Sequence, residues 1–484
     1  MEEIIKSVDG IVWSNALIVL CLGAGIYFSV ATRFLQIRYI REMVRLLFSK
    51  ESSGKGVTSF QAFAIAISGR VGTGNIAGVA TAIASGGPGA IFWMWVIALL
   101  GAASAFVEAT LGQIYKEVKD GQYRGGPAFY IEKGLNTKTF GILFAIVTII
   151  STAFFLPGVQ SNSIAQGMQE AFGISTWITG IGISVMLALI IFGGIKRISK
   201  VAEIVVPFMA LGYMIMAVII IGMNMERVPE MFSLIFRSAF GTEEIFGGIL
   251  GSAIAWGVKR GIYSNEAGQG TAPHAAAAAE VSHPAKQGLV QAFSVYIDTL
   301  FVCTATALMI LFTNSYNVQY PEPEREGQFI VQNLDATVKA GPAYTQTAIA
   351  HHFPTAGAPF VAISLMFFAF TTIMAYYYIA ETNLSYLDKK GSVIGLTLLR
   401  GVLLFAVFYG TIKSAKLAWA MGDIGVGLMA WINVIFILIL QKPALKAFRD
   451  YERQRKQKKD PVFDPEKLGI RNADFWKTYG KEEQ

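Results

Sequence analysis

The sequence has few charged residues for its length. Only 15% of its 484 residues are Asp, Glu, Lys or Arg, whereas 54% are hydrophobic, and the mean hydropathy is +0.49. A soluble protein carries about 25% charged residues, because its surface must stay in water. The composition therefore excludes an ordinary soluble multidomain protein and predicts a membrane protein with several spanning helices.

Cysteine and histidine are also scarce, with 2 and 4 residues. Cys21 and Cys303 both fall in long apolar runs, so neither a disulfide framework nor a cysteine-rich metal cluster is expected. None of the histidines has neighbours spaced as metal ligands. The sequence also lacks a Walker lysine motif, and Gly72-Thr73-Gly74 lacks the spacing of a dinucleotide loop, which disfavours ATP-driven transport and an organic cofactor.

Long apolar windows dominate the chain instead. A helix needs about 20 residues to cross the hydrocarbon of a bilayer. Eleven windows approach or exceed that length, and they cover residues 12–31, 60–85, 91–114, 139–168, 176–195, 201–222, 243–264, 288–312, 357–380, 392–410 and 417–440. The sequence therefore predicts an all-α polytopic membrane protein with eleven transmembrane helices.

Basic residues are placed unevenly between these windows. Eleven alternating spans put four basic segments on one side of the membrane, and these are 33–55, 196–200, 389–390 and the tail after 441. By the positive-inside rule this side is cytoplasmic, so we expect a plasma-membrane protein with its N-terminus outside and its C-terminus inside. The net charge of +7 follows from this placement or from attraction to anionic lipid, and nucleic acid is not an expected partner.

The ten spans after the first divide into two groups of five with opposite orientation, since five is odd. The first span of each group is rich in glycine, at 68–78 and at 247–261. Matching Gly-interrupted segments in inverted halves are typical of secondary transporters whose site lies near the middle of the membrane. The alternative is that these glycines only allow helices to pack closely.

This symmetry predicts five parts of the chain. They are an N-terminal helix with its basic connection (1–59), a first five-helix repeat (60–222), an extracellular linker helix (223–242), a second repeat (243–440) and a cytoplasmic tail (441–484). The tail is polar and charged, so we expect it to be partly helical and then flexible.

The first interruption, at 68–78, is the predicted binding site. Backbone that breaks at membrane depth must be buried in protein or line a cavity. There the N–H groups of one half-helix attract an anion, and the carbonyl groups of the other coordinate a cation. The expected contacts are Thr73, Gly74 and Asn75 for a substrate carboxylate, and the carbonyl groups of Ser68 and Val71 for sodium.

Sodium prefers oxygen ligands, so hydroxyl groups from another helix should complete its shell. Thr371 and Thr372 form an adjacent pair that we expect to do so. The alternative is that each hydroxyl bonds a carbonyl of its own helix.

Three segments make the chain recognisable. Residues 86–95 (GGPGAIFWMW) and 260–268 (RGIYSNEAG) closely resemble motifs of the alanine or glycine:cation symporter family, and 71–75 (VGTGN) resembles its first broken helix. The likeness extends over about residues 12–440, and the tail is similar to that of AlsT-like members. It implies the LeuT-like 5+5 inverted-repeat fold of the amino acid, polyamine and organocation superfamily, with one extra N-terminal helix. It also implies sodium-coupled uptake of a small neutral amino acid, with sodium as the coupling ion.

The resemblance also implies which residues form the site. It places the substrate near Thr73, Gly74, Asn75, Gln160, Trp256 and Thr372, and the cation near Ser68, Val71, Thr371 and Thr372. Tyr376 lies one helical turn beyond Thr372, where some relatives have tryptophan, and so adds to the expected substrate pocket. Because this change alters the pocket, alanine, glycine, serine and glutamine are all candidate substrates.

Arg70 departs from the pattern, because many relatives have an uncharged residue there. A guanidinium inside a membrane needs a carboxylate partner or a substrate. We hypothesise that Arg70 is a coupling or gating residue that occupies the place of a second sodium ion, leaving one sodium per cycle.

Two other functions stay open. A carrier of the same fold could couple protons, with Asp298 or Glu108 as the relay. A membrane-embedded enzyme or a channel is disfavoured, because the sequence places no nucleophile and base at one depth and contains no filter-like repeat.

Overall fold

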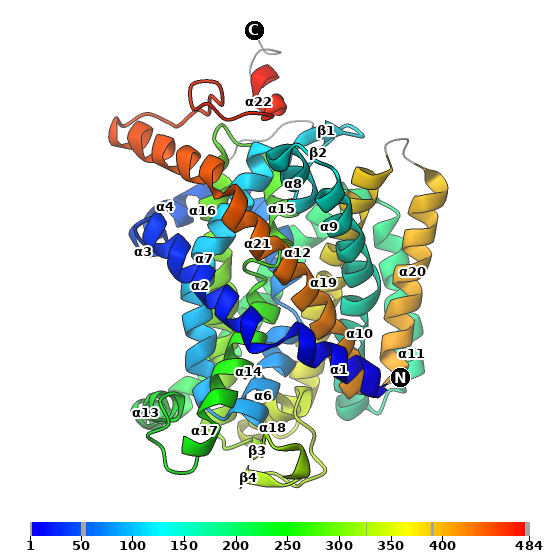
Figure 1. Ribbon diagram of the computed structural model, residues 1–484. Helices are drawn as coiled ribbons and strands as arrows, with labels where there is room; N and C mark the ends of the chain where they lie inside the picture. Colours follow the sequence, from blue (N-terminus) through cyan, green and yellow to red (C-terminus); the bar gives the residue numbers. More distant parts are fainter. Residues whose placement is uncertain (1, 50–54, 326, 389–391, 480–484) are drawn as a thin grey trace.

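The computed structural model describes residues 2–49, 55–325, 327–388 and 392–479, and these form an upright bundle of helices (Figure 1). Eight helices of the described chain are long and apolar enough to cross a membrane. They span Ile4–Ala31, Gly89–Ile114, Thr139–Phe172, Arg197–Met223, Pro284–Phe312, Gly357–Leu387, Val393–Ile412 and Ala415–Lys456. The prediction of a helical, membrane-embedded, polytopic protein is confirmed.

Two of these spans, Thr139–Phe172 and Pro284–Phe312, combine α-helix with a stretch of wider π-helix; the label η marks such stretches and also short 3-10 helices. The elements are α1 (Glu2–Val12), α2 (Asn15–Ala31), α7 (Gly89–Ile114), α9 (Thr139–Ile150), η2 (Ser151–Phe155), α10 (Leu156–Phe172), α12 (Gly194–Met223), α16 (Pro284–Val295), η5 (Tyr296–Cys303), α17 (Thr304–Phe312), α19 (Gly357–Leu387), α20 (Val393–Ile412) and α21 (Ala415–Lys456). Such π-turns are frequent at functional sites.

The other three predicted windows are short or interrupted helices. Window 176–195 is the 16-residue helix α11 (Thr176–Ile191). Window 60–85 contains α5 (Ser59–Arg70), η1 (Gly74–Gly78) and α6 (Val79–Gly86). Window 243–264 contains η4 (Gly247–Ile249) and α14 (Leu250–Asn265), and α15 (Ala272–Ala278) follows it.

The first interruption lies where the sequence predicts it. α5 begins with a capping box between Thr58 and Gln61, and it ends at Arg70. Val71 is extended, with φ −77° and ψ 90°, and the chain becomes helical again at Gly74. Gly, Thr and Asn at this point thus break the helix as expected.

The second interruption was predicted at 247–261, and this prediction is wrong. α14 continues to Asn265, and the chain leaves the helix at Glu266, which has a φ of +56°. The glycines before it serve close packing on α7, because a Cβ on Gly257 would lie 2.5 Å from the carbonyl oxygen of Ala90. The packing alternative is therefore correct for this segment.

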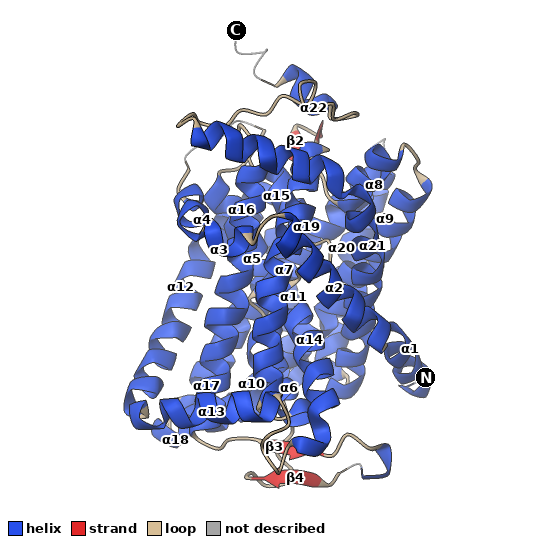
Figure 2. Cartoon of the chain, turned by 60° about the vertical axis from the view of Figure 1, so that its left-hand side comes forward, coloured by secondary structure: helices blue, strands red, loops and turns tan. Residues whose placement is uncertain are grey.

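The remaining elements lie outside the long helices. They are α3 (Leu35–Arg38), α4 (Ile40–Leu47), β1 (Glu117–Lys119), β2 (Gln122–Arg124), α8 (Pro127–Leu135), η3 (Met225–Arg227), α13 (Val228–Ala239), β3 (Asn317–Gln319), η6 (Pro323–Arg325), β4 (Phe329–Gln332), α18 (Pro342–His352) and α22 (Asp474–Thr478). β1 pairs with β2 and β3 with β4, both antiparallel. Two small hairpins therefore correct the all-α prediction, and Figure 2 shows them at opposite ends of the bundle.

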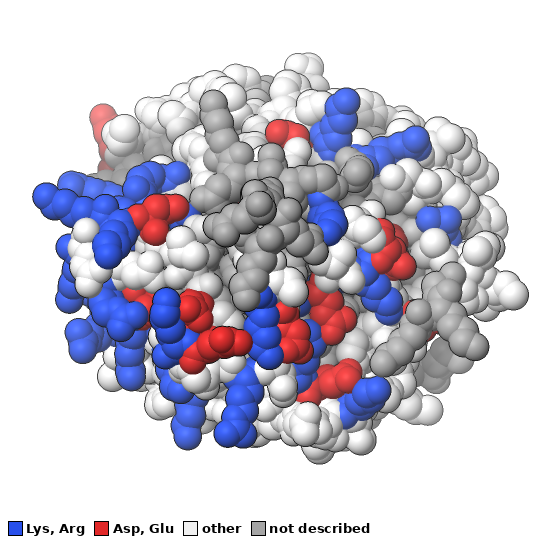
Figure 3. Space-filling view, turned by 90° about the horizontal axis from the view of Figure 1, so that it is seen from above, with Lys and Arg blue, Asp and Glu red and all other residues white. Residues whose placement is uncertain are grey.

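Basic residues gather at one end of the bundle (Figure 3). Figure 1 places α22 at one end, and α13, β3 and β4 at the other. Figure 3 looks onto the α22 end, where many Lys and Arg side chains gather with some acidic ones among them. The basic last turn of α21 belongs to this end, whereas Lys389 and Lys390 of the predicted basic pair lie outside the described residues.

The tail is more ordered than its composition suggests. The sequence predicts a flexible end after a short helix, but α21 extends to Lys456 and residues 457–479 fold back over the bundle. Phe463 and Trp476 are each only 5% exposed, and the Trp476 indole donates to the Gln113 carbonyl at 3.0 Å. A few aromatic side chains thus anchor a polar segment, which average composition does not reveal.

Lys116 is buried beneath this tail. Its ammonium donates to the carbonyl of Ala279 at 2.9 Å. It also lies 4.4, 4.5 and 5.3 Å from the ring centres of Tyr123, Phe475 and Trp476. The tail therefore contributes two of the three aromatic faces around this cation.

We expect docking of the tail to become more stable as the pH rises above about 7. Burial lowers the pKa of Lys116 to about 7, against the attraction of the Glu280 carboxylate. A solvated lysine has a pKa of about 10.4, so between the two values the undocked state binds more protons and docking strengthens with pH. Proteolysis of the tail at pH 7 and pH 9 measures this, and cleavage should be slower at pH 9. The expected pH dependence should disappear in Lys116→Met, and its absence from the wild type would contradict the account.

Candidate functional site

The break after α5 brings together residues from three helices. The N–H of Gly72 donates to Oδ1 of Asn75 at 2.8 Å, and the N–H of Thr73 donates to Oε1 of Gln160 at 3.0 Å. Gln160 comes from α10, and its side chain is 1% exposed. Two N–H groups of the break thus donate to side-chain amide oxygens and not to carbonyl groups of a helix. An anion could accept from the same N–H groups.

The carbonyl side of the break faces α19. Thr372 Oγ1 donates to the carbonyl of Ser68 at 2.8 Å and to that of Phe368 at 2.9 Å. Thr371 instead donates to the carbonyl groups of Phe367 and Phe368 in its own helix. The structure therefore brings Ser68 and Thr372 together, whereas the Thr371 hydroxyl follows the self-bonding alternative.

Asn75 ties the break to η5. Its amide donates to Oδ1 of Asp298 at 2.6 Å and to the carbonyl of the same residue at 3.2 Å. Asp298 also accepts hydrogen bonds from Ser264 at 3.0 Å and from Thr299 at 2.7 Å. This network is fully buried, which fixes the orientation of the Asn75 amide.

The two broken helices meet at Gly74. A Cβ at Gly74 would lie 3.1 Å from Cα of Ser264, which is one residue before the end of α14 at Asn265. Only a residue without a side chain allows this approach without displacing a neighbour. The break after α5 and the C-terminal end of α14 are therefore neighbours in space.

Tyr376 and Trp256, which were both predicted to line the substrate pocket, lie in different helices. Tyr376 lies in α19 one turn beyond Thr372 and is 2% exposed. Trp256 is half-buried, and its ring centre lies 5.1 Å from the Arg260 guanidinium. It precedes Ser264 by about 12 Å along α14, at about 1.5 Å per residue. Arg260, which Trp256 contacts, lies beside the interrupted segment, because its Cδ is 3.9 Å from a Cβ built on Gly78.

Arg70 is buried without the expected carboxylate contact. Its Nη1 donates to the carbonyl of Gln291 at 3.0 Å and to the hydroxyl of Ser294, both in α16. Within the described chain Arg70 forms no ion pair within 4.0 Å, and the carboxylates of Glu266, Glu108 and Asp298 attract it from farther away. A carbonyl and a hydroxyl thus bind Nη1, whereas Nε and Nη2 have no hydrogen-bond partner among the described residues.

A buried ion cluster lies along α14 between the break and the end opposite the tail. Arg260 donates to both oxygens of Asp423, at 2.7 and 3.0 Å, and Lys259 contacts Asp423 at 2.9 Å and Asp9 at 3.0 Å. The cluster joins α1, α14 and α21. Sequence reasoning missed the role of Asp9, although a lone acidic residue just before an apolar run was the available signal.

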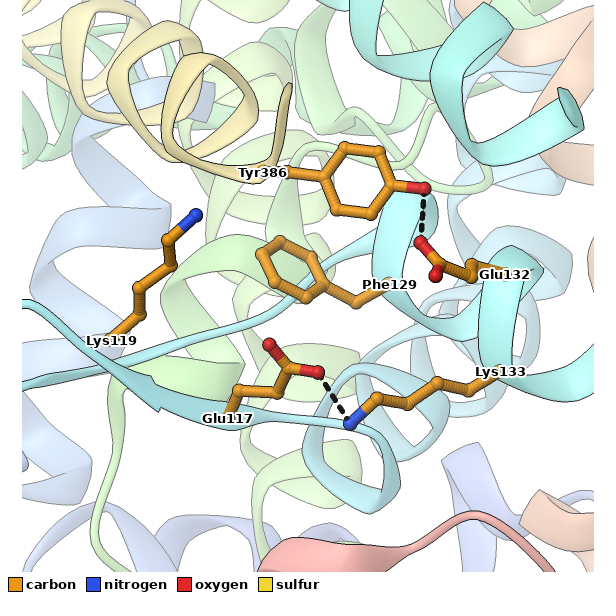
Figure 4. Close-up of a pocket in the computed structure, with 6 residues that line it drawn as sticks. All are labelled: Glu117, Lys119, Phe129, Glu132, Lys133 and Tyr386. Atoms are coloured by element: carbon orange, nitrogen blue, oxygen red, sulfur yellow. Dashed lines mark hydrogen bonds and ion pairs between the residues drawn. The ribbon is translucent and has the colours of Figure 1, made fainter. Parts of the chain in front are cut away.

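A separate cavity of about 250 Å³ lies near the tail end, between β1, α8 and α19 (Figure 4). Its charged groups are already paired, because Lys133 contacts Glu117 at 2.9 Å and the Tyr386 hydroxyl donates to Glu132 at 2.5 Å. None of the predicted substrate or cation residues lines it. The helix break is therefore the better candidate for the transport site.

Comparison with known proteins agrees with the resemblance seen in the sequence. The model of the sodium:alanine symporter family matches residues 1–465. The chain is 61% identical to YrbD of Bacillus subtilis, over 100% of this chain and 99% of YrbD. It is 55% identical to the sodium/proton-dependent alanine carrier protein of Bacillus sp. strain PS3, over 90% of this chain and 97% of that protein.

Among solved structures, the chain resembles a manganese transporter of Eremococcus coleocola. The TM-score is 0.51 with 12% identity, over 84% of this chain and 92% of that chain. This is a likeness of fold alone. The family match and the two carrier relatives identify the chain as a transporter. The chain belongs to the sodium:alanine symporter family, whose members are carriers and not enzymes.

Proposed function

We propose that this protein carries alanine into the cell together with sodium, by alternating access. Family membership and the alanine carrier relative support cation-coupled alanine symport. The observation that carries the proposal is the break itself, where N–H groups of Gly72 and Thr73 face acceptors beside the Ser68 carbonyl. One break supplies an anion-binding and a cation-binding end.

In this proposal the substrate carboxylate binds the N–H groups at Thr73, Gly74 and Asn75. It displaces the amide oxygen of Gln160, because a hydrogen bond to a charged acceptor is stronger than one to a neutral amide. The freed Gln160 amide then donates to the carboxylate. Thr372, Tyr376 and Trp256 border the pocket in this proposal.

Sodium binds at the other end of the break. We propose the carbonyl groups of Ser68 and Val71 and the hydroxyl of Thr372 as ligands, with Thr371 joining if it turns from its own helix. The Thr372 hydroxyl must first release the Ser68 carbonyl. Arg70 takes the place of a second sodium, so the cycle uses one. An unchanged Hill slope for sodium in Arg70→Ala would contradict this role.

We further propose the eleven-helix topology and the five-part division expected from the sequence. Within a 5+5 inverted repeat that follows one N-terminal helix, the first and sixth spans would be the interrupted ones, at α5–α6 and α14–α15. The N-terminus lies outside and the tail inside. The meeting of Gly74 with Ser264 supports a shared site at the centre of this repeat.

Uptake of labelled alanine into proteoliposomes tests the function. An inward sodium gradient should drive accumulation, and replacement of sodium by choline at fixed pH should abolish it. Unlabelled alanine should compete best, and glycine, serine and glutamine define the limits of the pocket. Equal uptake in sodium and in choline would refute sodium coupling.

A further inference from the structure

Four charged side chains are buried around the two breaks. Arg70, Glu108, Glu266 and Asp298 are each at most 2% exposed. One guanidinium and three ionised carboxylates leave an excess of negative charge, which is costly inside a membrane protein. At least one further positive charge must therefore join this cluster, as a proton or as a bound cation.

Two of the three carboxylates are already saturated with hydrogen bonds. Both oxygens of Glu108 and both oxygens of Asp298 accept from the protein. The donors are the N–H groups of Gly268 and Gly270 and the amide of Asn433 for Glu108, and the side chains of Asn75, Ser264 and Thr299 for Asp298. These carboxylates, which were the relay candidates from the sequence, thus have no oxygen without a hydrogen-bond donor.

Glu266 differs from both. Its Oε2 accepts from the Thr271 hydroxyl at 2.7 Å, but its Oε1 has no hydrogen-bond partner among the described residues. The residue also adopts a left-handed conformation, with φ +56°, which is uncommon for a side chain of this kind and is found at functional sites. It is the acidic residue of the 260–268 motif, and the proposed site leaves it without a role.

A small cavity adjoins this carboxylate. Its volume is about 10 Å³, which is room for one water molecule. The lining comes from α5, α15 and α19 and includes Gly69, Thr271 and Tyr378. A Cβ on Gly69 would lie 3.3 and 3.6 Å from the two carboxylate oxygens, so glycine there keeps Glu266 close against the last turn of α5.

The chemistry of this cavity favours a proton over sodium. Apart from Glu266, Thr271 and Tyr378, its lining consists of Gly, Ala and Ile. Sodium needs several oxygen ligands, whereas a proton needs one carboxylate oxygen and a path for water. The charged and titratable groups that act on Glu266 are Arg70 of α5, Asp298 of η5, Tyr263 of α14 and Tyr376 of α19.

We propose that Glu266 is the carboxylate that takes up a coupling proton. A proton from water on one side of the membrane bonds to Oε1 of Glu266, which neutralises it while α5, α15 and α19 are closed around it. When these helices separate toward the other side, water enters the cavity and removes the same proton. This inference rests on the proposed alanine symport and adds a second coupling ion at the same pair of breaks.

The test uses proteoliposomes with equal sodium on both sides and an inward gradient of about one pH unit. In the wild type this gradient should raise the initial rate of labelled alanine uptake about threefold or more. Glu266→Gln, which imitates the protonated form, should lose this response and yet retain alanine-for-alanine exchange without any gradient. The matched control is Glu203→Gln, a half-buried carboxylate of α12 outside the cluster, and it should respond as the wild type does.

Gly69→Ala provides a second variant in case Glu266→Gln does not fold. Its methyl group crowds the carboxylate, so the pH response should fall about twofold or more while sodium-driven uptake persists.

Three results would overturn the inference. The first is a pH response in Glu266→Gln equal to that of the wild type. The second is a Glu266→Gln variant whose sodium dependence shifts while its pH response is unchanged, which would indicate that sodium binds this carboxylate. The third is wild-type uptake that a sodium gradient drives but a pH gradient does not, which overturns this inference and leaves the proposed function standing. Uptake driven by neither gradient overturns the proposed function as well.

Discussion

Gly72→Ala is expected to abolish alanine transport while the protein still folds. A Cβ at this position would lie 2.5 Å from Oγ1 of Thr372 and 2.9 Å from Oε1 of Gln160. These atoms hold the break, because Gln160 accepts from the Thr73 N–H and Thr372 donates to the Ser68 carbonyl, so a methyl group that turns them away removes contacts of the site. Because displacement of a binding group by about 1 Å costs about 100-fold in rate, the initial rate of labelled alanine uptake should fall by at least that factor.

Gly78→Ala is the matched control for this substitution. Gly78 lies in the same interrupted segment, but the nearest atom to a Cβ there is a ring carbon of Trp419 at 3.6 Å, which is an ordinary contact. Uptake by Gly78→Ala should therefore stay close to the wild-type rate. If Gly72→Ala transports alanine at a rate similar to that control, the break does not hold the substrate.

Asp423→Ala is expected to cause the largest loss of stability. Asp423 is 2% exposed and contacts both Arg260 and Lys259, so its removal leaves two buried cations without this partner. Breaking a buried ion pair in this way costs about 3–5 kcal/mol. Thermal unfolding of the purified protein in detergent measures the effect as a lower melting temperature.

Asp464→Ala serves as the control for stability. Asp464 pairs with Lys467 at 3.1 Å on the exposed tail, where its side chain is 42% exposed. Such surface pairs contribute about 0–1 kcal/mol, so the melting temperature should hardly change. A similarly small effect of Asp423→Ala would mean that the buried cluster does not hold α1, α14 and α21 together.

The first break could be predicted because its cause is local. Glycines beside Asn75 in an apolar run weaken a helix whatever surrounds them. Ser68, Thr372 and Gln160 were also predicted near one another, and the structure places them so. That part of the site followed from the resemblance of the motifs, since sequence spacing alone does not bring α5, α10 and α19 together.

The second break was misplaced because glycine has two uses in membrane helices. Gly257 permits contact with α7, whereas the actual break at Glu266 carries no glycine at the residue that leaves the helix. Whether a glycine packs or breaks depends on its neighbour in space.

The roles of Glu266 and the tail could not be read from composition. The unpaired oxygen of Glu266 becomes visible only when the donors to Glu108 and Asp298 are known. The tail has a polar average, yet Phe463 and Trp476 suffice to anchor it. In both cases the decisive contacts join residues far apart in the sequence.

The central claim is that one break binds alanine and sodium together, and equilibrium binding of labelled alanine to the purified protein tests it most directly. Alanine affinity should be about tenfold higher in sodium chloride than in choline chloride at equal ionic strength, and alanine should raise sodium affinity by the same factor. Equal alanine affinity in the two salts would contradict the account.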